Sequence, residues 1–168
     1  MMKRFLPLIL IASFSISSAE QAITQWVYNT LERAQANLDK GNLEAAERIY
    51  YDYANDTWSS RSYDHFVILR TYAYFLISYD RNEEALKYLK QASLKRDMPP
   101  YDIFELNFTL GQVYYVNGDR ENAKKTLLKW VEIGEKNKLD LKPEGYAILA
   151  TIYAQDEEWG NALKFITL

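Results

Sequence analysis

The sequence contains no cysteine and only one histidine, His65. Without cysteine there can be no disulfide bond, no thiol nucleophile and no zinc site with Cys ligands. A single imidazole without a partner motif favours a residue at a surface or a helix start over a catalytic or metal-binding residue. Glycine-rich phosphate loops and nucleophile motifs are also missing. We therefore expect a protein that is not an enzyme and that uses no metal and no cofactor.

Positive charge is neither abundant nor clustered. The chain has 20 basic and 23 acidic residues, for a formal net charge of −3, and it contains no basic run. A nucleic-acid surface concentrates Lys and Arg, so we expect no nucleic-acid binding. The acidic pairs Glu83–Glu84 and Glu157–Glu158 are typical of helix starts, where carboxylates interact favourably with the helix dipole.

A leader-like segment stands at the N-terminus, where the basic start MMKR precedes the mostly apolar run FLPLILIASFSI. This run is shorter than the roughly 20 residues that span a bilayer, and Pro7 interrupts it. Ser17 and Ala19 are the small residues that signal peptidase requires before its cut. We predict a signal peptide over 1–19, cleaved between Ala19 and Glu20. The alternatives are a retained membrane anchor and a buried first helix.

An exported chain that is acidic and free of cysteine fits a bacterial periplasm better than an oxidising eukaryotic lumen. We therefore expect a periplasmic protein. If the leader stays uncleaved, it would be the protein's contact with the membrane.

Small residues recur at a fixed distance along the chain. Ala46, Ala85, Ala123 and Ala162 are separated by 39, 38 and 39 positions. Twelve positions before each of them stands a second small residue, and these are Ala34, Ala73, Gly111 and Ala150. Such a period predicts a repeat array. Each unit has the pattern of two helices, and small side chains where the helices cross let the backbones approach closely.

The third unit shows how the two helices would be joined. Gly118 of the segment NGDREN can adopt the left-handed conformation that ends a helix, and Asp119 can cap the next one. Pro100 and Pro143 suit the first turn of the first helix in the third and fourth units.

This pattern resembles the tetratricopeptide repeat (TPR), whose signature is W-x2-L-G-x2-Y followed by A-x3-F. The first unit is the weakest match, with Ala34, Ala46 and Tyr50 in place. The third unit departs at the Trp position, where it has Asn107. The matching residues of the other units are Leu69, Tyr72, Ala73, Leu76, Ala85, Leu89 and Ala92 in the second, Leu110, Gly111, Tyr114, Ala123 and Leu127 in the third, and Tyr146, Leu149, Ala150, Tyr153, Ala162 and Ile166 in the fourth.

The resemblance implies an all-α, right-handed α-solenoid of about four TPR-like helix-turn-helix repeats with a period of 38–39 residues. The repeats would lie at about 23–57, 66–98, 102–136 and 143–168, within a domain that spans 20–168. The family's usual period is about 34 residues, so we expect the additional residues in the connections between helix pairs. The function that it implies is protein–protein interaction.

The resemblance also implies a binding groove on the concave face, lined by fixed positions of each first helix. In the second and third repeats these positions hold Arg70, Tyr74, Ile77, Phe108, Gln112 and Tyr115. In the outer repeats they hold Leu31, Gln35, Leu38, Ala147, Thr151 and Gln155. Tyr74, Phe108 and Tyr115 would be aromatic anchors for a partner segment. Only Arg70 among the residues equivalent to a carboxylate clamp is basic, so we expect no such clamp.

A narrower likeness concerns the segment YAILATIYAQDEEWGNAL, together with Trp130 upstream, Trp159 and the leader. It resembles the exported TPR proteins that accompany TonB energy-transduction systems. That likeness implies a periplasmic accessory of a TonB-type transport complex. The alternatives are a membrane-anchored adaptor with an uncleaved leader and a cell-wall glycan-associated protein that binds through Tyr and Trp faces.

The last repeat has an apolar stripe that no following helix pair covers. We expect part of the stripe formed by Ala150, Tyr153, Leu163 and Ile166 to lie exposed as an apolar patch. Three explanations are open: a fragment of a longer array, a patch that pairs with a second copy, and a patch that a partner covers. We favour the first, with self-association through the C-terminal repeat as its consequence in solution.

Overall fold

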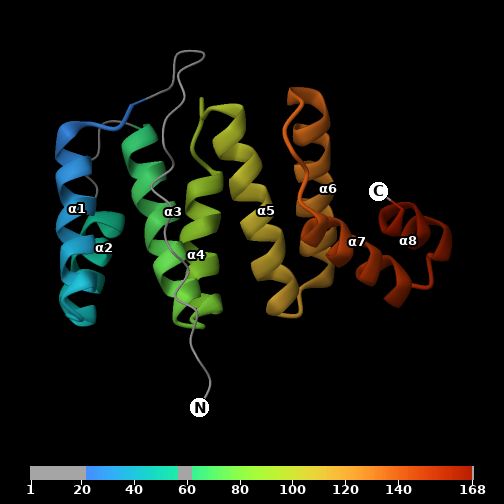
Figure 1. Ribbon diagram of the computed structural model, residues 1–168, viewed down its shortest axis with the longest axis horizontal. Helices are drawn as coiled ribbons and strands as arrows, with labels where there is room; N and C mark the ends of the chain where they lie inside the picture. The colour runs from blue at the N-terminus through green and yellow to red at the C-terminus, as the bar shows by residue number, and fades with distance from the viewer. Residues whose placement is uncertain (1–21, 57–61, 168) are drawn as a thin grey trace.

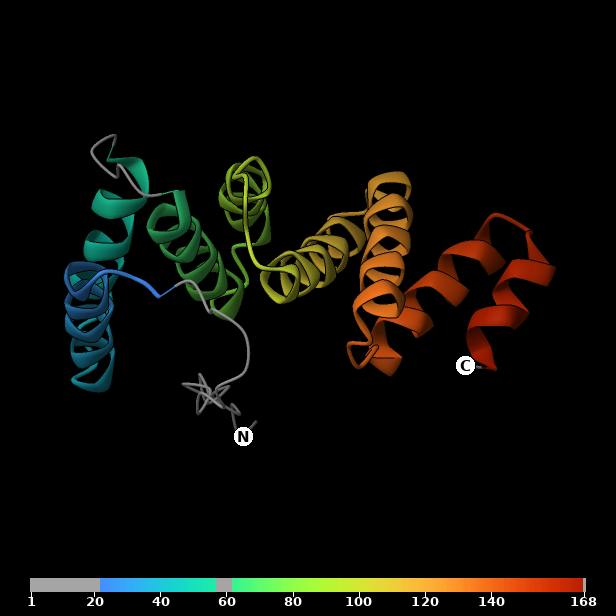
Figure 2. The same cartoon turned by 90° about the horizontal axis from the view of Figure 1, so that it is seen from above.

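The computed structural model describes residues 22–56 and 62–167, and all regular secondary structure in these ranges is α-helical. The helices are α1 (Gln25–Asp39), α2 (Leu43–Asn55), α3 (Ser62–Ser78), α4 (Asn82–Ser93), α5 (Pro100–Val116), α6 (Arg120–Asn137), α7 (Pro143–Gln155) and α8 (Trp159–Ile166). They pack as four pairs in one row, from α1 and α2 at one end to α7 and α8 at the other (Figure 1, Figure 2). The predicted all-α array of helix pairs is confirmed.

The structure can be compared with the predicted start of the second repeat but not with the predicted signal peptide. The predicted signal peptide, with its cleavage site at Ala19 and Glu20, lies outside the described residues. Within the ranges described, no helix is long and apolar enough to cross a membrane. Helix α3 begins at Ser62, before the residue 66 expected for the second repeat.

The periodic small residues all lie in the interior. Seven of the eight are alanines buried in the core, and Gly111 is buried within α5. A Cβ added to Gly111 would lie 2.6 Å from Cγ of Leu127 on α6. The close helix crossing predicted for these positions is therefore confirmed, and Leu127 is the side chain that fills the space above Gly111.

The turn inside each helix pair contains one residue in the left-handed conformation, and these residues recur with the spacing of the repeat. The four are Gly41, Asp80, Gly118 and Glu157, with φ between 61° and 79°. Gly118 was expected from the sequence, because glycine adopts this conformation freely. Asp80 and Glu157 carry a side chain there, and a left-handed backbone costs such a residue about 1–2 kcal/mol.

The predicted helix starts are found in the structure. The Asp119 carboxylate accepts a hydrogen bond of 3.2 Å from the backbone N–H of Asn122 and so caps α6. Pro100 and Pro143 are the first residues of α5 and α7. Glu83 and Glu84 lie in the first turn of α4. Local sequence chemistry therefore sets where these helices begin.

The hydrophobic core consists of two clusters along the row. One runs from α1 to α5 and also includes Ala123 of α6 and Ile152 of α7, and the other joins α5 and α6 to α7 and α8. Trp130, which is fully buried, is central to the second: its ring contacts Phe104 and Phe108 of α5 and Tyr146 of α7. The row is thus held together by contacts between successive pairs, as in other repeat arrays.

The apolar stripe of the last repeat is uncovered only in part. Leu163 and Ile166 are 62% and 70% exposed, as predicted, whereas Ala150 and Tyr153 are buried. Phe165, the residue before Ile166, is buried between the rings of Tyr146 and Tyr153, and so it takes the place that the TPR signature gives to Ile166. In this short helix the direction of the side chain, rather than the repeat spacing, decides which residue reaches the core.

Candidate interaction surface

The first helices of the four pairs share one side of the row, which we call the first-helix face. Helices α1 and α3 are in contact there, as are α5 and α7. Helices α3 and α5 are joined on this side by side-chain hydrogen bonds, one of which runs from the Thr109 hydroxyl to the Tyr74 hydroxyl at 3.4 Å. This is the side on which the sequence placed the binding groove.

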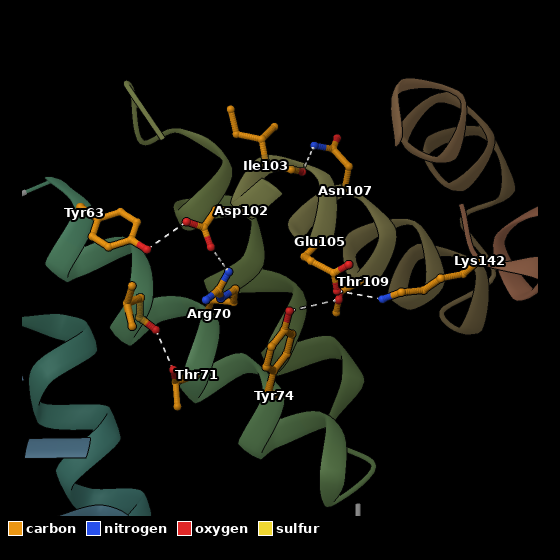
Figure 3. A network of polar contacts seen from close by, with 11 residues as sticks. Tyr63, Arg70, Thr71, Tyr74, Asp102, Ile103, Glu105, Asn107, Thr109 and Lys142 are labelled. Atoms are coloured by element: carbon orange, nitrogen blue, oxygen red, sulfur yellow. Dashed lines mark hydrogen bonds and ion pairs between the residues drawn. The ribbon is translucent and has the colours of Figure 1, made fainter. Parts of the chain in front are cut away.

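A buried carboxylate links α3 to α5 at the centre of this face (Figure 3). Asp102 accepts a hydrogen bond of 3.0 Å from the Tyr63 hydroxyl and forms an ion pair with Arg70. The Arg70 guanidinium also lies 5.1 Å from the ring centroid of Phe66. Burial opposes the charge of Arg70, but Tyr74 and Asp102 outweigh it, so the pKa of the guanidinium is raised. We call Tyr63, Arg70 and Asp102 the Asp102 cluster.

A second ion pair links α5 to the start of α7 on the same face (Figure 3). The Lys142 ammonium donates to the Glu105 carboxylate at 2.8 Å and lies 4.5 Å from the ring centroid of Phe108. Phe108 is only 7% exposed, and its ring packs on Trp130. The prediction that Phe108 is an accessible groove anchor is therefore corrected: it is a core residue beneath Lys142.

Tyr101 is an exposed aromatic residue of this region that no sequence pattern singled out. Its side chain is 59% exposed. Partial burial and the nearby Glu105 raise the pKa of its hydroxyl, and Lys142 and Arg70 lie close enough to oppose that shift. Tyr101 thus stands among the residues of both ion pairs and keeps its phenolic proton at neutral pH.

A signal for the Asp102 cluster was present in the sequence. Asp64 and Asp102 are 38 positions apart, so they occupy equivalent positions in two successive repeats. Both are buried, and Asp64 accepts a 3.0 Å hydrogen bond from the backbone N–H of Thr24, in the preceding repeat. An alignment of the repeats beyond the family signature would have placed both residues in the first turn of a first helix.

The other predicted groove residues differ in their exposure along the row. Ile77 and Tyr115 are half-buried and pack against the core, as do Leu31 and Leu38. Gln112 and Gln35 are half-buried, whereas Thr151, Ala147 and Gln155 of α7 are exposed. The structure therefore brings Arg70 and Tyr74 together with Tyr101, while the remaining predicted residues lie along the face on either side.

Across residues 22–56 and 62–167 there is no group of three His, Asp or Glu side chains placed to hold a metal ion. His65 lies in the first turn of α3, half-buried, with Nε2 3.1 Å from the Ala54 carbonyl oxygen and Nδ1 2.9 Å from the Lys95 ammonium. Its ring is occupied by structural contacts at the junction of α2 and α3.

Comparison with known proteins shows a likeness of fold. No protein-family model matches the chain. Pre-mRNA-splicing factor 6 of Saccharomyces cerevisiae (strain ATCC 204508 / S288c) is 29% identical over 118 residues, which cover 64% of this chain and 11% of that protein. The chain therefore matches a small part of that protein's length.

Solved structures cover more of the chain. A pilF structure from Pseudomonas aeruginosa has a TM-score of 0.63 and 20% identity, covering 83% of this chain and 57% of that one. A putative kinesin light chain from Podospora anserina with nearly identical TPR-like repeats has a TM-score of 0.61 and 18% identity, covering 84% of this chain and 72% of that one. The chain has a TPR-like α-solenoid fold.

Proposed function

We propose that this protein is a non-enzymatic interaction scaffold that binds a segment of a protein partner on its first-helix face. TPR-like arrays present extended surfaces of this kind. The observation that carries the proposal is the group formed by Tyr74, Tyr101 and the two ion pairs beside them. Tyrosine supplies a large contact area with little loss of side-chain freedom, and it is common among the residues that dominate binding energy.

The partner segment that fits this group is apolar or neutral. The Arg70 and Lys142 cations are already paired with Asp102 and Glu105. A partner's terminal carboxylate would have to compete with these internal pairs. A peptide with an acidic EEVD-type end should therefore bind no better than its C-terminally amidated form, and isothermal titration calorimetry of the two peptides would measure the difference.

In-cell photocrosslinking tests the choice of surface. A benzophenone amino acid at Tyr101 should crosslink a protein partner, and Thr151, exposed on α7, offers a second position. Tyr51 is the matched control, because it is a similarly exposed tyrosine on the second helix of the first pair. Crosslinking from Tyr51 and not from Tyr101 would place the interaction on the other side of the array.

The proposal includes export to the periplasm through the leader. Its support is the basic start, the short apolar run and the small residues before Glu20. Cell fractionation should recover the protein in the periplasm, and the intact mass should correspond to a chain that begins at Glu20. An intact mass that includes residues 1–19 would instead favour a membrane-anchored adaptor.

At the level of the partner, we propose an accessory role in a TonB-type transport complex, which rests on the likeness of the segment around Trp159. Mass spectrometry of the Tyr101 crosslinks should then identify a TonB, ExbB or ExbD component. Cell-wall glycan is the alternative ligand, and retention on purified sacculi without any protein crosslink would support it.

A further inference from the structure

We infer that His65 is a pH-sensitive latch, whose protonation releases the connection between α4 and α5 from the first turn of α3. The two residues before it tie this turn to both neighbouring repeats. The Asp64 carboxylate accepts from a backbone N–H of the first repeat, and the Tyr63 hydroxyl donates to Asp102 in the third. His65 lies where the end of α2 and the connection 94–99 meet this same turn.

The contacts of His65 determine which ring nitrogen carries the hydrogen. Nε2 lies 3.1 Å from the Ala54 carbonyl oxygen, which can only accept, so Nε2 is the donor. Nδ1 lies 2.9 Å from the Lys95 ammonium, which can only donate, so Nδ1 is the acceptor. Among the described residues Lys95 has no ion pair, and this imidazole is the acceptor for its ammonium. The neutral form of His65 therefore holds both segments.

A second proton on the ring is incompatible with the contact to Lys95. It would occupy Nδ1, which could then no longer accept, and it would set two cations against each other. The ring also belongs to the first turn of a helix, where the dipole disfavours positive charge. In the described chain the charged groups that act on the ring are Lys95 and Asp56, just after α2. Burial and Lys95 together outweigh Asp56 and the backbone carbonyl, so the pKa of the ring is lowered.

Release of Lys95 affects the start of α5. Lys95 is the second residue of the connection 94–99, and Tyr101 follows two residues after that connection ends. Met98 of the same connection is buried in the core. We therefore expect the connection to loosen between α4 and Met98, while α5 stays in the array. Weaker binding at Tyr101 in acid would follow; that consequence rests on the proposed function, whereas the latch does not.

Proton NMR of the purified protein tests the contact between His65 and Lys95. The chain contains one histidine, so the imidazole Cε1–H signal reports on His65 alone. Its titration midpoint should lie below about 6.5, the ordinary value for histidine. Lys95→Met keeps a long side chain without the ammonium and should raise the midpoint. Lys87→Met, which removes an exposed ammonium from α4, is the matched control and should not change it. An unchanged midpoint in Lys95→Met would overturn the inference.

Amide hydrogen exchange tests the release itself. The backbone N–H groups of Leu94 and Lys95 donate to carbonyl oxygens in the last turn of α4, at 3.2 and 3.1 Å, so their exchange reports on the connection. Between about pH 7 and about pH 5, and after correction for intrinsic rates, their protection should fall by about threefold or more, because opening is then linked to protonation. Amides of α6 should keep their protection.

His65→Gln separates the latch from a general effect of acid. Its amide can hydrogen-bond but does not titrate, so the protection of Leu94 and Lys95 in this variant should be the same at both pH values. Unchanged protection of these two amides in the unsubstituted chain would overturn the inference. A loss of the same size in α6 would also overturn it, because the whole array would then be opening.

Discussion

Two glycines inside helices have opposite surroundings in this protein. A Cβ at Gly111 would lie 2.6 Å from Leu127, whereas a Cβ at Gly160 would have no neighbour within 4 Å. The same substitution should therefore have opposite effects at these positions. At Gly111 the helix crossing decides the outcome, and at Gly160 the intrinsic helix preference of the new residue does.

We predict that Gly111→Ala destabilises the protein by about 1–3 kcal/mol, because the close crossing of α5 and α6 has no room for a methyl group. Gly160→Ala should stabilise α8 by up to about 1 kcal/mol, because alanine favours a helix more than glycine does. Thermal melting followed by circular dichroism measures both. Equal shifts of the melting temperature in the same direction would contradict this account of Gly111.

The single histidine gives stability a dependence on pH near neutrality. Burial, and then the nearby Lys95, lower the pKa of His65, although the Ala54 carbonyl and Asp56 oppose this shift. A lowered pKa in the folded state means that the unfolded chain binds the proton more tightly. The stabilising contribution of neutral His65 is therefore complete above about pH 6.5 and is lost as the pH falls below that value.

We predict that the melting temperature falls between about pH 7 and about pH 5, a range in which carboxylates of ordinary pKa stay charged. In His65→Gln, whose side-chain amide can hydrogen-bond but does not titrate, the fall should be smaller. If the variant shows the same fall as the unsubstituted protein, His65 does not cause the pH dependence.

At the scale of single residues, the features that could be predicted from the sequence are those set by local chemistry or by the spacing of the repeat. The buried small residues, the Asp119 cap and the proline helix starts are of this kind. The left-handed conformation of Asp80 and Glu157 was missed, because turn chemistry alone favours glycine there. The burial of Phe165 instead of Ile166 depends on which way a short helix faces, and spacing does not determine that.

At the scale of elements, the largely buried ion pair of Arg70 and Asp102 holds α3 and α5 together. The side chains of Arg70 and Asp102 are 20% and 9% exposed, whereas those of Arg48 and Asp52 on α2 are 82% and 59% exposed. Removing one partner of a buried pair leaves an uncompensated charge, and an exposed pair contributes little.

We predict that Asp102→Ala destabilises the protein by about 3–5 kcal/mol, because it strands Arg70 and removes the acceptor of the Tyr63 hydroxyl. Asp52→Ala is the matched control and should cost less than about 1 kcal/mol. Thermal melting of the two variants measures the difference. Similar melting temperatures would show that the Asp102 cluster does not hold α3 and α5 together.

The candidate surface was predictable only in part, for a reason that lies at this scale. The positions that the TPR resemblance assigns to the groove put Arg70 and Tyr74 on one first helix, and the structure has both on α3. The resemblance could not show that Phe108 is covered by Lys142, because that contact depends on the connection before α7. Tyr101 lies before the signature positions, in the first turn of α5, and only the packing of α3 against α5 brings it beside Tyr74.

At the scale of the whole molecule, stability is divided along the row. Trp130 joins α5 and α6 to α7 within the second cluster, whereas the first cluster does not include Trp130 and reaches α7 through Ile152. A Cβ on Gly145 would come within 2.4 Å of the Trp130 ring, so α7 packs directly against the indole. In an array of this kind each pair depends mainly on its neighbours.

We predict that Trp130→Ala, at a cost of about 3–5 kcal/mol, loosens the last pair while the first two pairs keep their structure. Hydrogen exchange should accelerate in α7 and α8 and stay slow in α3 and α4. Leu128→Ala, at a more exposed position of the same helix, should leave exchange unchanged. Uniform loss of protection over all eight described helices would show that the array unfolds as one unit.

Binding to the first-helix face is the central claim, and titration of the crosslinked partner with paired variants tests it most directly. Tyr74→Ala with Tyr101→Ala removes the aromatic surface beside the two ion pairs, whereas Tyr51→Ala with Leu128→Ala removes exposed apolar side chains from second helices. The first variant should lose at least about tenfold in affinity, or about 1.4 kcal/mol, and the second should bind as the unsubstituted chain does. Unchanged binding by a folded Tyr74 and Tyr101 variant would contradict the claim.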